Sequence, residues 1–285
     1  MHVTRGRHRE PVSYHLFCDA LDERGADESA LFARAVRRTV SGLVTHGQYA
    51  QAARGNQRMA GVERRLALAL EVDANPVAAL FPPAVGQGAF EARWNALNQA
   101  VHWGVKTFLV HGHANANANA NADEDRGRVR RVPANGGQEA DDVFRAALMG
   151  HGLALLSGRA RVSLVDDAHV LLALCGHLGL QRAVVREVLA LLHEEPDAGI
   201  DRCAARLATS VRTLQRQLAR EGLVFAELKQ AVRVTMAGHR MRHRDESLTA
   251  TAHASGFFDS AHMAHAWQVA CGISPSAYRA IVKVG

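Results

Sequence analysis

Apolar residues recur at intervals of three and four along most of the chain, which is the spacing of one face of an α-helix. This period predicts helices over about 29–53, 62–72, 90–108, 167–178 and 182–193. The stretch DANPVAALFPPAVGQG breaks the pattern with three prolines and two glycines. Few β-branched residues alternate before residue 110, and hairpin turns are scarce there. The pattern therefore predicts a mainly α fold, with a helix-rich N-terminal part whose architecture stays open.

Residues 112–138 carry no such period. Their alternating Ala and Asn (HANANANANA) have no apolar face, and burial of so little surface does not offset the entropy of ordering them. We expect a flexible low-complexity loop or linker there. An N-terminal sensor or dimerisation region (1–111) precedes it. A helical continuation of that region (139–181) and a C-terminal domain (182–285) follow it.

The charge of the chain indicates an anionic binding partner. The chain has 285 residues, a net charge of +6 and a pI of about 9.6. Residues 200–285 hold 12 Lys or Arg against 6 Asp or Glu, whereas residues 1–199 hold 22 of each kind. The whole positive excess thus lies in the last third of the chain, which favours a C-terminal domain that binds a polyanion.

Candidate chemistry is sparse by comparison. The cysteines at 18, 175, 203 and 271 form no CxxC pair, and we interpret them as reduced, buried thiols. His111 and His113 form an HxH pair without further ligands at a recognisable spacing, so no metal and no cofactor are predicted. No catalytic motif is found, and no apolar run reaches the length of a membrane span or follows the basic start as a signal peptide would.

Residues 200–222, IDRCAARLATSVRTLQRQLAREG, are typical of a short helix, a tight turn and a second helix. Ser210 is placed to cap the second helix and Gly222 to end it. The inward positions are Val211, Leu214 and Leu218. The outward arginine row is equally compatible with an ordinary exposed helix and with a helix that enters a DNA groove.

A second copy of the pattern at 247–272 favours DNA. Gly256 marks its turn, Asp259 or Ser260 can cap its second helix, and Met263 and Trp267 repeat the inward spacing of Leu214 and Leu218 49 residues later. A helical run between the units, FAELKQAVRVTMAGHRMRH, could hold them at a fixed separation. Two rigidly linked units can enter successive major grooves about 34 Å apart on one face of DNA.

The region from Arg182 to Val284 resembles the DNA-binding domain of the AraC/XylS family of bacterial transcription regulators. The matching pieces are LATSVRTLQRQLAREG, AVRVTMAGHRM and GFFDSAHMAHAWQVACGISPSAYR. The family's Gly-Phe turn and Gly-x-Ser-Pro-x-x-Tyr-Arg signature fall at Gly256, Phe257, Gly272, Ser274, Pro275, Tyr278 and Arg279. The resemblance implies an all-α module of seven helices with two helix-turn-helix units, and a cytoplasmic, sequence-specific, non-enzymatic transcription regulator.

The expected DNA contacts lie in the two second helices: Ser210, Arg212, Thr213, Gln215, Arg216, Arg220, Ser260, His262 and His265. Arginine pairs bidentately with guanine and glutamine with adenine, so Arg212, Gln215 and Arg216 are assigned to base readout. Arg220 is assigned to phosphate or solvent. The family often has arginine where His265 stands, basic residues near Gln268 and a large aliphatic residue where Thr251 stands. We therefore expect the first unit to carry most of the base readout.

The resemblance says less about the rest of the chain. Promoter DNA is the expected partner, and RNA polymerase, a small-molecule or protein effector and a second copy of the chain are compatible further partners; no membrane is expected. Family members often carry a cupin-like β-barrel as sensor, but the helical period of residues 29–110 does not fit one. The aromatics Phe90, Trp94, Trp103 and Phe108 fit a core better than a ligand pocket. An enzyme fused to a DNA-binding module is the alternative, and Cys18 and Cys175 lie at apolar positions unlike those of a reactive thiol.

Overall fold

Helices form most of the chain that the structure describes, a computed structural model in which residues 9–10, 28–42, 44–45, 61–81, 85–100, 105–109, 129–133, 167–180 and 183–284 are described. Before residue 182 the described helices are α2 (Glu28–Val40), α4 (Val62–Glu71), the 3-10 turn η1 (Ala78–Leu80), α5 (Gln87–Ala100) and α7 (Val170–His177). The predicted mainly α fold is confirmed. No described helix is long and apolar enough to cross a membrane.

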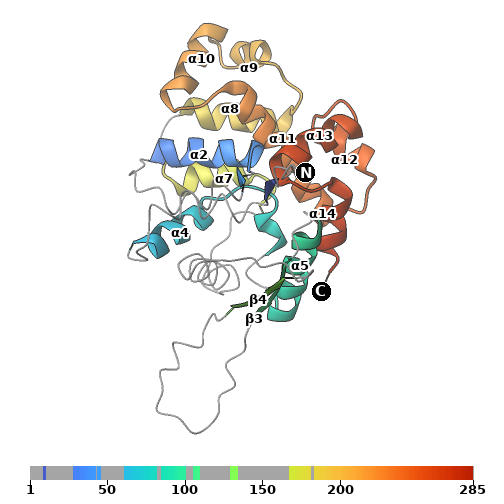
Figure 1. The fold of residues 1–285 in the computed structure, drawn as a ribbon. Coiled ribbons are helices and arrows are strands. Elements are labelled where there is room, and N and C mark those ends of the chain that lie inside the picture. Colours follow the sequence, from blue (N-terminus) through green and yellow to red (C-terminus); the bar gives the residue numbers. More distant parts are fainter. Residues whose placement is uncertain are drawn as a thin grey trace, which may run out of the picture.

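Seven helices follow in the C-terminal region, as the resemblance implies. They are α8 (Ala183–Glu194), α9 (Ile200–Arg206), α10 (Val211–Arg220), α11 (Phe225–His243), α12 (Leu248–Ala254), α13 (Ser260–Cys271) and α14 (Pro275–Val282). Figure 1 shows α9 and α10 at one end of this region and α12, α13 and α14 at the other, with α11 running between them.

Two short hairpin-like pairings interrupt the helical pattern. Strand β1 (Arg9–Glu10) pairs with β2 (Val44–Thr45), and β3 (Val105–Leu109) pairs with β4 (Val129–Pro133), both antiparallel. In the second pair Val105 lies opposite Pro133 and Leu109 opposite Val129. Strand β4 lies inside the range 112–138, for which the sequence predicts an irregular segment. The remaining residues of that range, and His111 and His113, lie outside the described residues.

Two helix predictions were too long. The helix predicted over 29–53 ends at Val40, after which Val44 joins a strand. The helix predicted over 90–108 ends at Ala100, and Val105 and Phe108 lie in β3. In both places β-branched residues that continue the helical spacing pair with a distant strand instead, and such long-range pairing is invisible to a local period. Residues 46–53 and 139–166 lie outside the described part, as do Cys18 and Trp103.

The buried apolar residues form two large cores, and each contains both N-terminal and C-terminal residues. One core joins α4, η1 and α5 to the second half of α11 and to α12, α13 and α14; among its largest side chains are Phe90, Trp267 and Tyr278. The other joins α2 and α7 to α8, α9, α10 and the first half of α11; Phe32 and Leu171 are fully buried in it. The C-terminal helices therefore share their apolar interior with the N-terminal ones.

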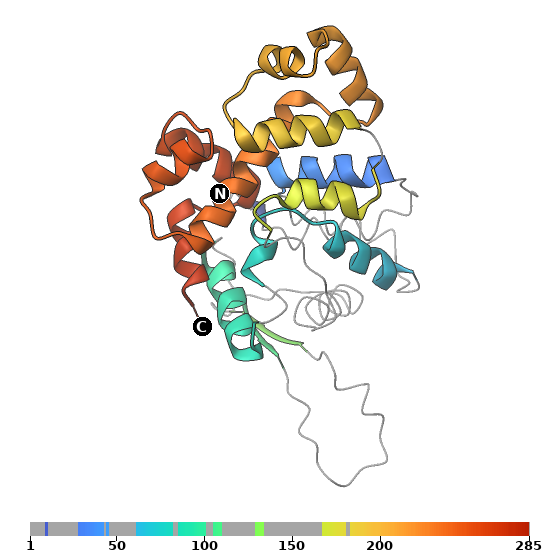
Figure 2. The same ribbon diagram turned by 180° about the vertical axis from the view of Figure 1, so that it is seen from behind.

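Helix α2 lies beside the C-terminal region along α11 and reaches α13 (Figures 1 and 2). Its apolar face buries Phe32, Ala33, Ala35 and Val36 almost completely. Burial of a Phe or Val side chain contributes about 1.5–3 kcal/mol. Contacts of this kind make α2 an integral part of the frame that holds the two helix-turn-helix units.

His193, near the end of α8, is a buried imidazole that contacts His169 with its ring, the two ring centroids being 4.4 Å apart. Neither of its ring nitrogens has a hydrogen-bond partner in the described part of the chain. Burial lowers the pKa of His193 to about 4; the neighbouring His169 acts in the same direction, and Asp167 opposes it. The folded protein thus holds His193 in its neutral form.

We expect the protein to lose stability as the pH falls from about 6.5 towards 4. The unfolded chain binds a proton at His193 near pH 6.5, whereas the folded chain binds it only near pH 4, so acid favours unfolding. The contribution to the free energy of unfolding lost over this window is at most about 3 kcal/mol. Urea unfolding of the wild type and of His193→Phe between pH 7 and pH 4 measures it. Parallel pH profiles for the two proteins would contradict the expectation.

Candidate nucleic-acid interface

The first helix-turn-helix unit is built as its sequence predicts. The Ser210 hydroxyl accepts a hydrogen bond from the Thr213 backbone N–H (3.1 Å) and caps α10, which ends before Gly222 at φ +69°. Leu214 and Leu218 are fully buried, and Val211 is half-buried. The turn before the cap carries Ala208 at φ +49°, the only described non-glycine residue in that region of backbone space. Helix α10 is therefore fixed at its start and along its inner face.

The outer face of α10 carries unpaired charge. Arg212, Gln215, Arg216 and Arg220 are exposed. Within the described part of the chain, the guanidinium groups of the three arginines on α10 form no ion pair or hydrogen bond. Other arginines of the region are engaged: Arg202 and Arg206 with Glu195, Arg240 with Glu246, Arg233 with the Pro196 carbonyl, and Arg242 with the Tyr278 hydroxyl. Three arginines without a described partner thus lie together on the outer face of this helix.

The paired arginines stabilise the region instead of presenting charge. Arg240 on α11 donates two hydrogen bonds to Glu246 (2.8 and 2.7 Å), and this keeps the pKa of the Glu246 carboxyl below its usual value. Glu246 in turn accepts the Thr251 hydroxyl (3.0 Å). Thr251 is fully buried in α12 where the family has a large aliphatic residue, so its hydrogen bond to Glu246 satisfies a polar group that would otherwise be costly there.

The second unit repeats the geometry of the first. The Asp259 carboxylate, and not Ser260, accepts the capping hydrogen bond, from the His262 backbone N–H (2.7 Å). Met263 and Trp267 are fully buried, as predicted. Gly256 has φ +79°, and a Cβ there would lie 2.7 Å from the Pro196 carbonyl carbon. The turn therefore requires glycine for both backbone conformation and space.

Residues on the outer face of α13 carry no fixed positive charge. His262 and His265 are exposed and Ser260 is half-exposed. The Nδ1 atom of His262 accepts the Phe258 backbone N–H (3.4 Å), and its ring meets Phe257 edge to face with centroids 5.4 Å apart. His262 therefore helps to hold the turn, while His265 stays open to solvent.

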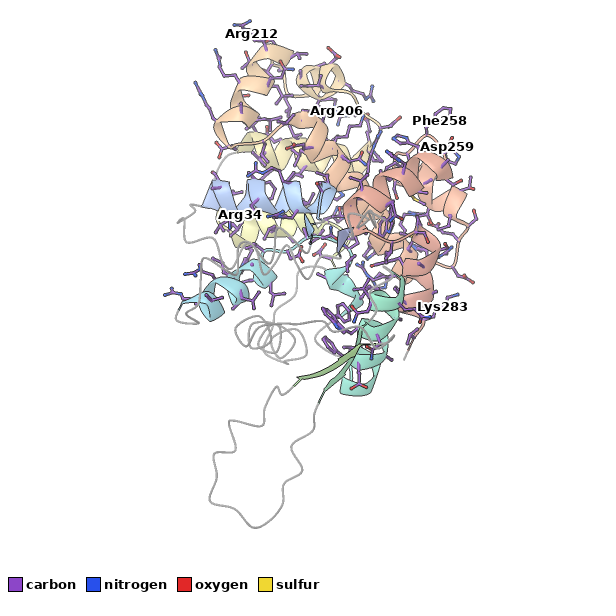
Figure 3. All side chains as sticks on the ribbon, in the orientation of Figure 1. Arg34, Arg206, Arg212, Phe258, Asp259 and Lys283 are labelled. Carbon is purple, nitrogen blue, oxygen red and sulfur yellow. The ribbon has the colours of Figure 1, made fainter. Side chains whose placement is uncertain are left out.

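The sequence pattern did not single out Phe258. Its side chain is 82% exposed directly before the cap of α13. Figure 3 shows Arg212 at the outer side of α10 and Phe258 at the outer side of the part that carries α13, both away from α4 and α5. The second Phe of GFFDS was the available signal, because only one Phe is needed to fill the turn and Phe257 does so at 3% exposure.

N-terminal residues hold the rear end of α10. Ser29 on α2 donates a hydrogen bond to the buried Glu221 carboxylate (2.6 Å). Arg37 on the same helix donates to the Gly222 carbonyl (3.1 Å). Both contacts lie at the end opposite the arginines that are expected to read bases.

The rear end of α13 is held by Asn75, which is fully buried in the turn before η1. Its Nδ2 donates to the carbonyls of Ala270 (3.0 Å) and Arg38 (3.1 Å), and its Oδ1 accepts the Val77 N–H (3.0 Å). A Cβ at Gly42 would lie 2.7 Å from this Nδ2, so the glycine leaves the room that the amide needs. N-terminal residues thus contact the rear ends of both α10 and α13.

Two capped helices of this kind, each behind a short helix and joined by α11, define a double helix-turn-helix DNA-binding domain. Residues 203–281 match a helix-turn-helix domain family. Over 77 residues the chain is 39% identical to the HTH-type transcriptional activator RhaS of Escherichia fergusonii. This aligned stretch covers 27% of the present chain and 28% of RhaS. No solved structure matches the chain. The C-terminal domain of this chain is a DNA-binding domain of the AraC/XylS family.

The described part of the chain contains no cluster of three His, Cys, Asp or Glu residues that could hold a metal ion. Cys175, Cys203 and Cys271 are buried free thiols, and burial raises the pKa of each. Thiols held in the protonated form are poor nucleophiles.

Asn75→Ala is expected to lower the free energy of unfolding by about 2–4 kcal/mol, because it leaves buried carbonyls and an N–H of three segments without partners. Gln99→Ala, at an exposed position of α5, is the control and should change it by less than about 0.5 kcal/mol. Urea denaturation followed by circular dichroism measures both. Equal stability of the two variants would show that Asn75 does not join the N-terminal region to α13.

Proposed function

We propose that the protein is a sequence-specific transcriptional regulator that inserts α10 and α13 into successive major grooves of promoter DNA. The observation that carries the proposal is the row of unpaired, exposed arginines on a capped helix of an AraC-type domain. The frame of α2, α11 and the Asn75 turn supports it, because a second helix of the same build is held at a fixed position relative to the first.

Within α10 the residues take different parts. Arg212, Gln215 and Arg216 lie on the exposed face of its first two turns, from which recognition helices contact base edges. Arg220 lies in the last turn and binds backbone phosphate. Ser210 and Thr213 share a hydrogen bond between their hydroxyls (2.9 Å) at the helix start, where backbone N–H groups and the helix dipole favour a phosphate.

The N-terminal region would report on an effector, on RNA polymerase or on a second copy of the chain. The described aromatics do not mark a ligand site: Phe81, Phe90 and Trp94 pack on one another, with ring centroids 5.0–6.2 Å apart, inside a core. The frame contacts give such a signal a physical route, because any shift of α2 moves the residues that hold Glu221 and Gly222. A location in the bacterial cytoplasm follows from the proposed target.

DNA binding by the full chain across a salt series tests the proposal. The full chain is needed because both cores contain N-terminal residues, and a C-terminal fragment would expose them. We expect the binding constant for a preferred promoter sequence to fall steeply with salt while the preference over unrelated DNA remains. Steep salt dependence without sequence preference would reduce the domain to a general polyanion binder.

Arg216→Ala is expected to weaken binding to the preferred site by about 1–3 kcal/mol and to relax discrimination at one base pair. Arg220→Ala should instead weaken binding to all sequences equally and lower the salt slope by about one. Fluorescence anisotropy titrations on matched duplexes measure both effects. Arg64→Ala removes the same charge from an exposed position on α4, far from α10 in Figure 1, and serves as the control.

The ranking of the two units is tested by the same titrations with His265→Ala. We expect this variant to bind nearly as well as the wild type. If His265→Ala abolished specific binding while Arg216→Ala left it intact, the second unit would be the main reader of bases and our assignment would be reversed.

A further inference from the structure

The outer surface at the start of α13 is apolar where that of α10 is polar. The two helices align with an offset of 49 residues, which places Ala261, Ala264 and His265 where Arg212, Gln215 and Arg216 stand in α10. Ala261 is exposed and Ala264 is half-exposed. Together with Phe258, the start of α13 therefore presents two methyl groups and an aromatic ring to a ligand.

The backbone of Phe258 is held in place, whereas its side chain is exposed to solvent. Its N–H is held by His262 Nδ1 (3.4 Å), and Asp259, the next residue, caps α13. Phe257 beneath it is buried, with the Arg233 guanidinium 5.7 Å from its ring centroid. A single exposed apolar residue is ordinary on a protein surface. What distinguishes Phe258 is that its exposure, 82%, is the highest among the large apolar residues of the described part, and that it stands at the entry of a recognition helix.

The chemistry of the major groove supplies a ligand for such a surface. Thymine alone presents a methyl group there, and alanine and phenylalanine side chains recognise it by apolar contact. A guanidinium or carboxamide would have to be added to read a purine edge, and α13 offers neither at these positions. His265 remains as a hydrogen-bonding side chain beside the apolar residues.

We propose that the second unit reads thymine methyl groups through Phe258 and Ala261, so that the two half-sites are recognised by different chemistry. The first half-site is read by hydrogen bonds from α10, and the second by burial of thymine methyls against α13. This inference rests on the proposed function and specifies what the weaker unit recognises: a thymine-containing half-site.

Deoxyuridine substitution tests the proposal, because deoxyuridine keeps the base pair and the O4 acceptor of thymine and lacks only the methyl group. The half-site of α10 is located first, as the positions at which Arg216→Ala no longer distinguishes bases. Thymines are then replaced separately in each half of the preferred duplex, and dissociation constants are measured for the full-length wild type, Phe258→Ala and Phe258→Leu. Their circular dichroism spectra check that the exposed substitutions leave the fold intact.

We expect replacement in the second half-site to weaken wild-type binding about fourfold for each methyl that is buried, from about 0.8 kcal/mol per methyl. Phe258→Ala should bind the thymine duplex more weakly and lose most of the sensitivity to deoxyuridine. Phe258→Leu should retain part of it, because an apolar contact remains. Replacement in the first half-site should affect wild type and Phe258→Ala alike.

Three results would overturn the proposal. One is full deoxyuridine sensitivity in Phe258→Ala together with unchanged affinity. Another is that Phe258→Ala binds DNA as the wild type does but supports less transcription by purified RNA polymerase, which would make Phe258 a contact for the polymerase. In either case Arg216→Ala would still weaken binding and the proposed function would stand. The third is absence of any sequence preference in the wild type, which would overturn the proposed function as well.

Discussion

The packing of α2 against α11 is the constraint on which the rest of the structure depends. Helix α11 contributes its first half to one core and its second half to the other, so a helix that packs along it touches both helix-turn-helix units. From α2, Ser29 and Arg37 reach the end of α10, and the Arg38 carbonyl binds the Asn75 amide that also holds α13. Both α10 and α13 are therefore held by residues outside the domain that contains them.

Electrostatics separates residues that build this frame from residues that are free to bind. Arginines in α9 and α11 form ion pairs or hydrogen bonds with nearby carboxylates, a backbone carbonyl and a tyrosine hydroxyl. Those of α10 face solvent without a described partner. Surface ion pairs contribute little to stability, so the pairs with Glu195 and Glu246 matter mainly because these carboxylates offset positive charge away from α10. Three unpaired arginines thus lie together on one helix face, and this local charge describes the candidate interface better than the total net charge of +6 does.

The two units share a scaffold and differ in their outer surfaces. In each, a side-chain oxygen caps the second helix, a residue with positive φ lies in the turn before it (Ala208 or Gly256), and two apolar residues four apart anchor the inner face. The outer face of α10 carries arginines and a glutamine. The outer face of α13 carries alanines and histidines, and Phe258 lies just before this helix. Because the inner residues decide the fold, one scaffold can carry two different outer surfaces.

The sequence alone determined the C-terminal domain: its seven helices, the inward residues, the cap at Ser210 and the family follow from local spacing and a motif. It also placed the candidate DNA contacts, since the face of a helix is a local property. Tertiary structure alone decided that the helix expected beyond Val40 stops there, that Val105 and Phe108 join a strand, that Arg202, Arg206 and Arg240 are paired, and that Asn75 supports α13. The strand pairs and the Asn75 contact join segments that lie far apart in the chain, and the arginine pairs join neighbouring elements across a turn. A helical period records neither kind of contact.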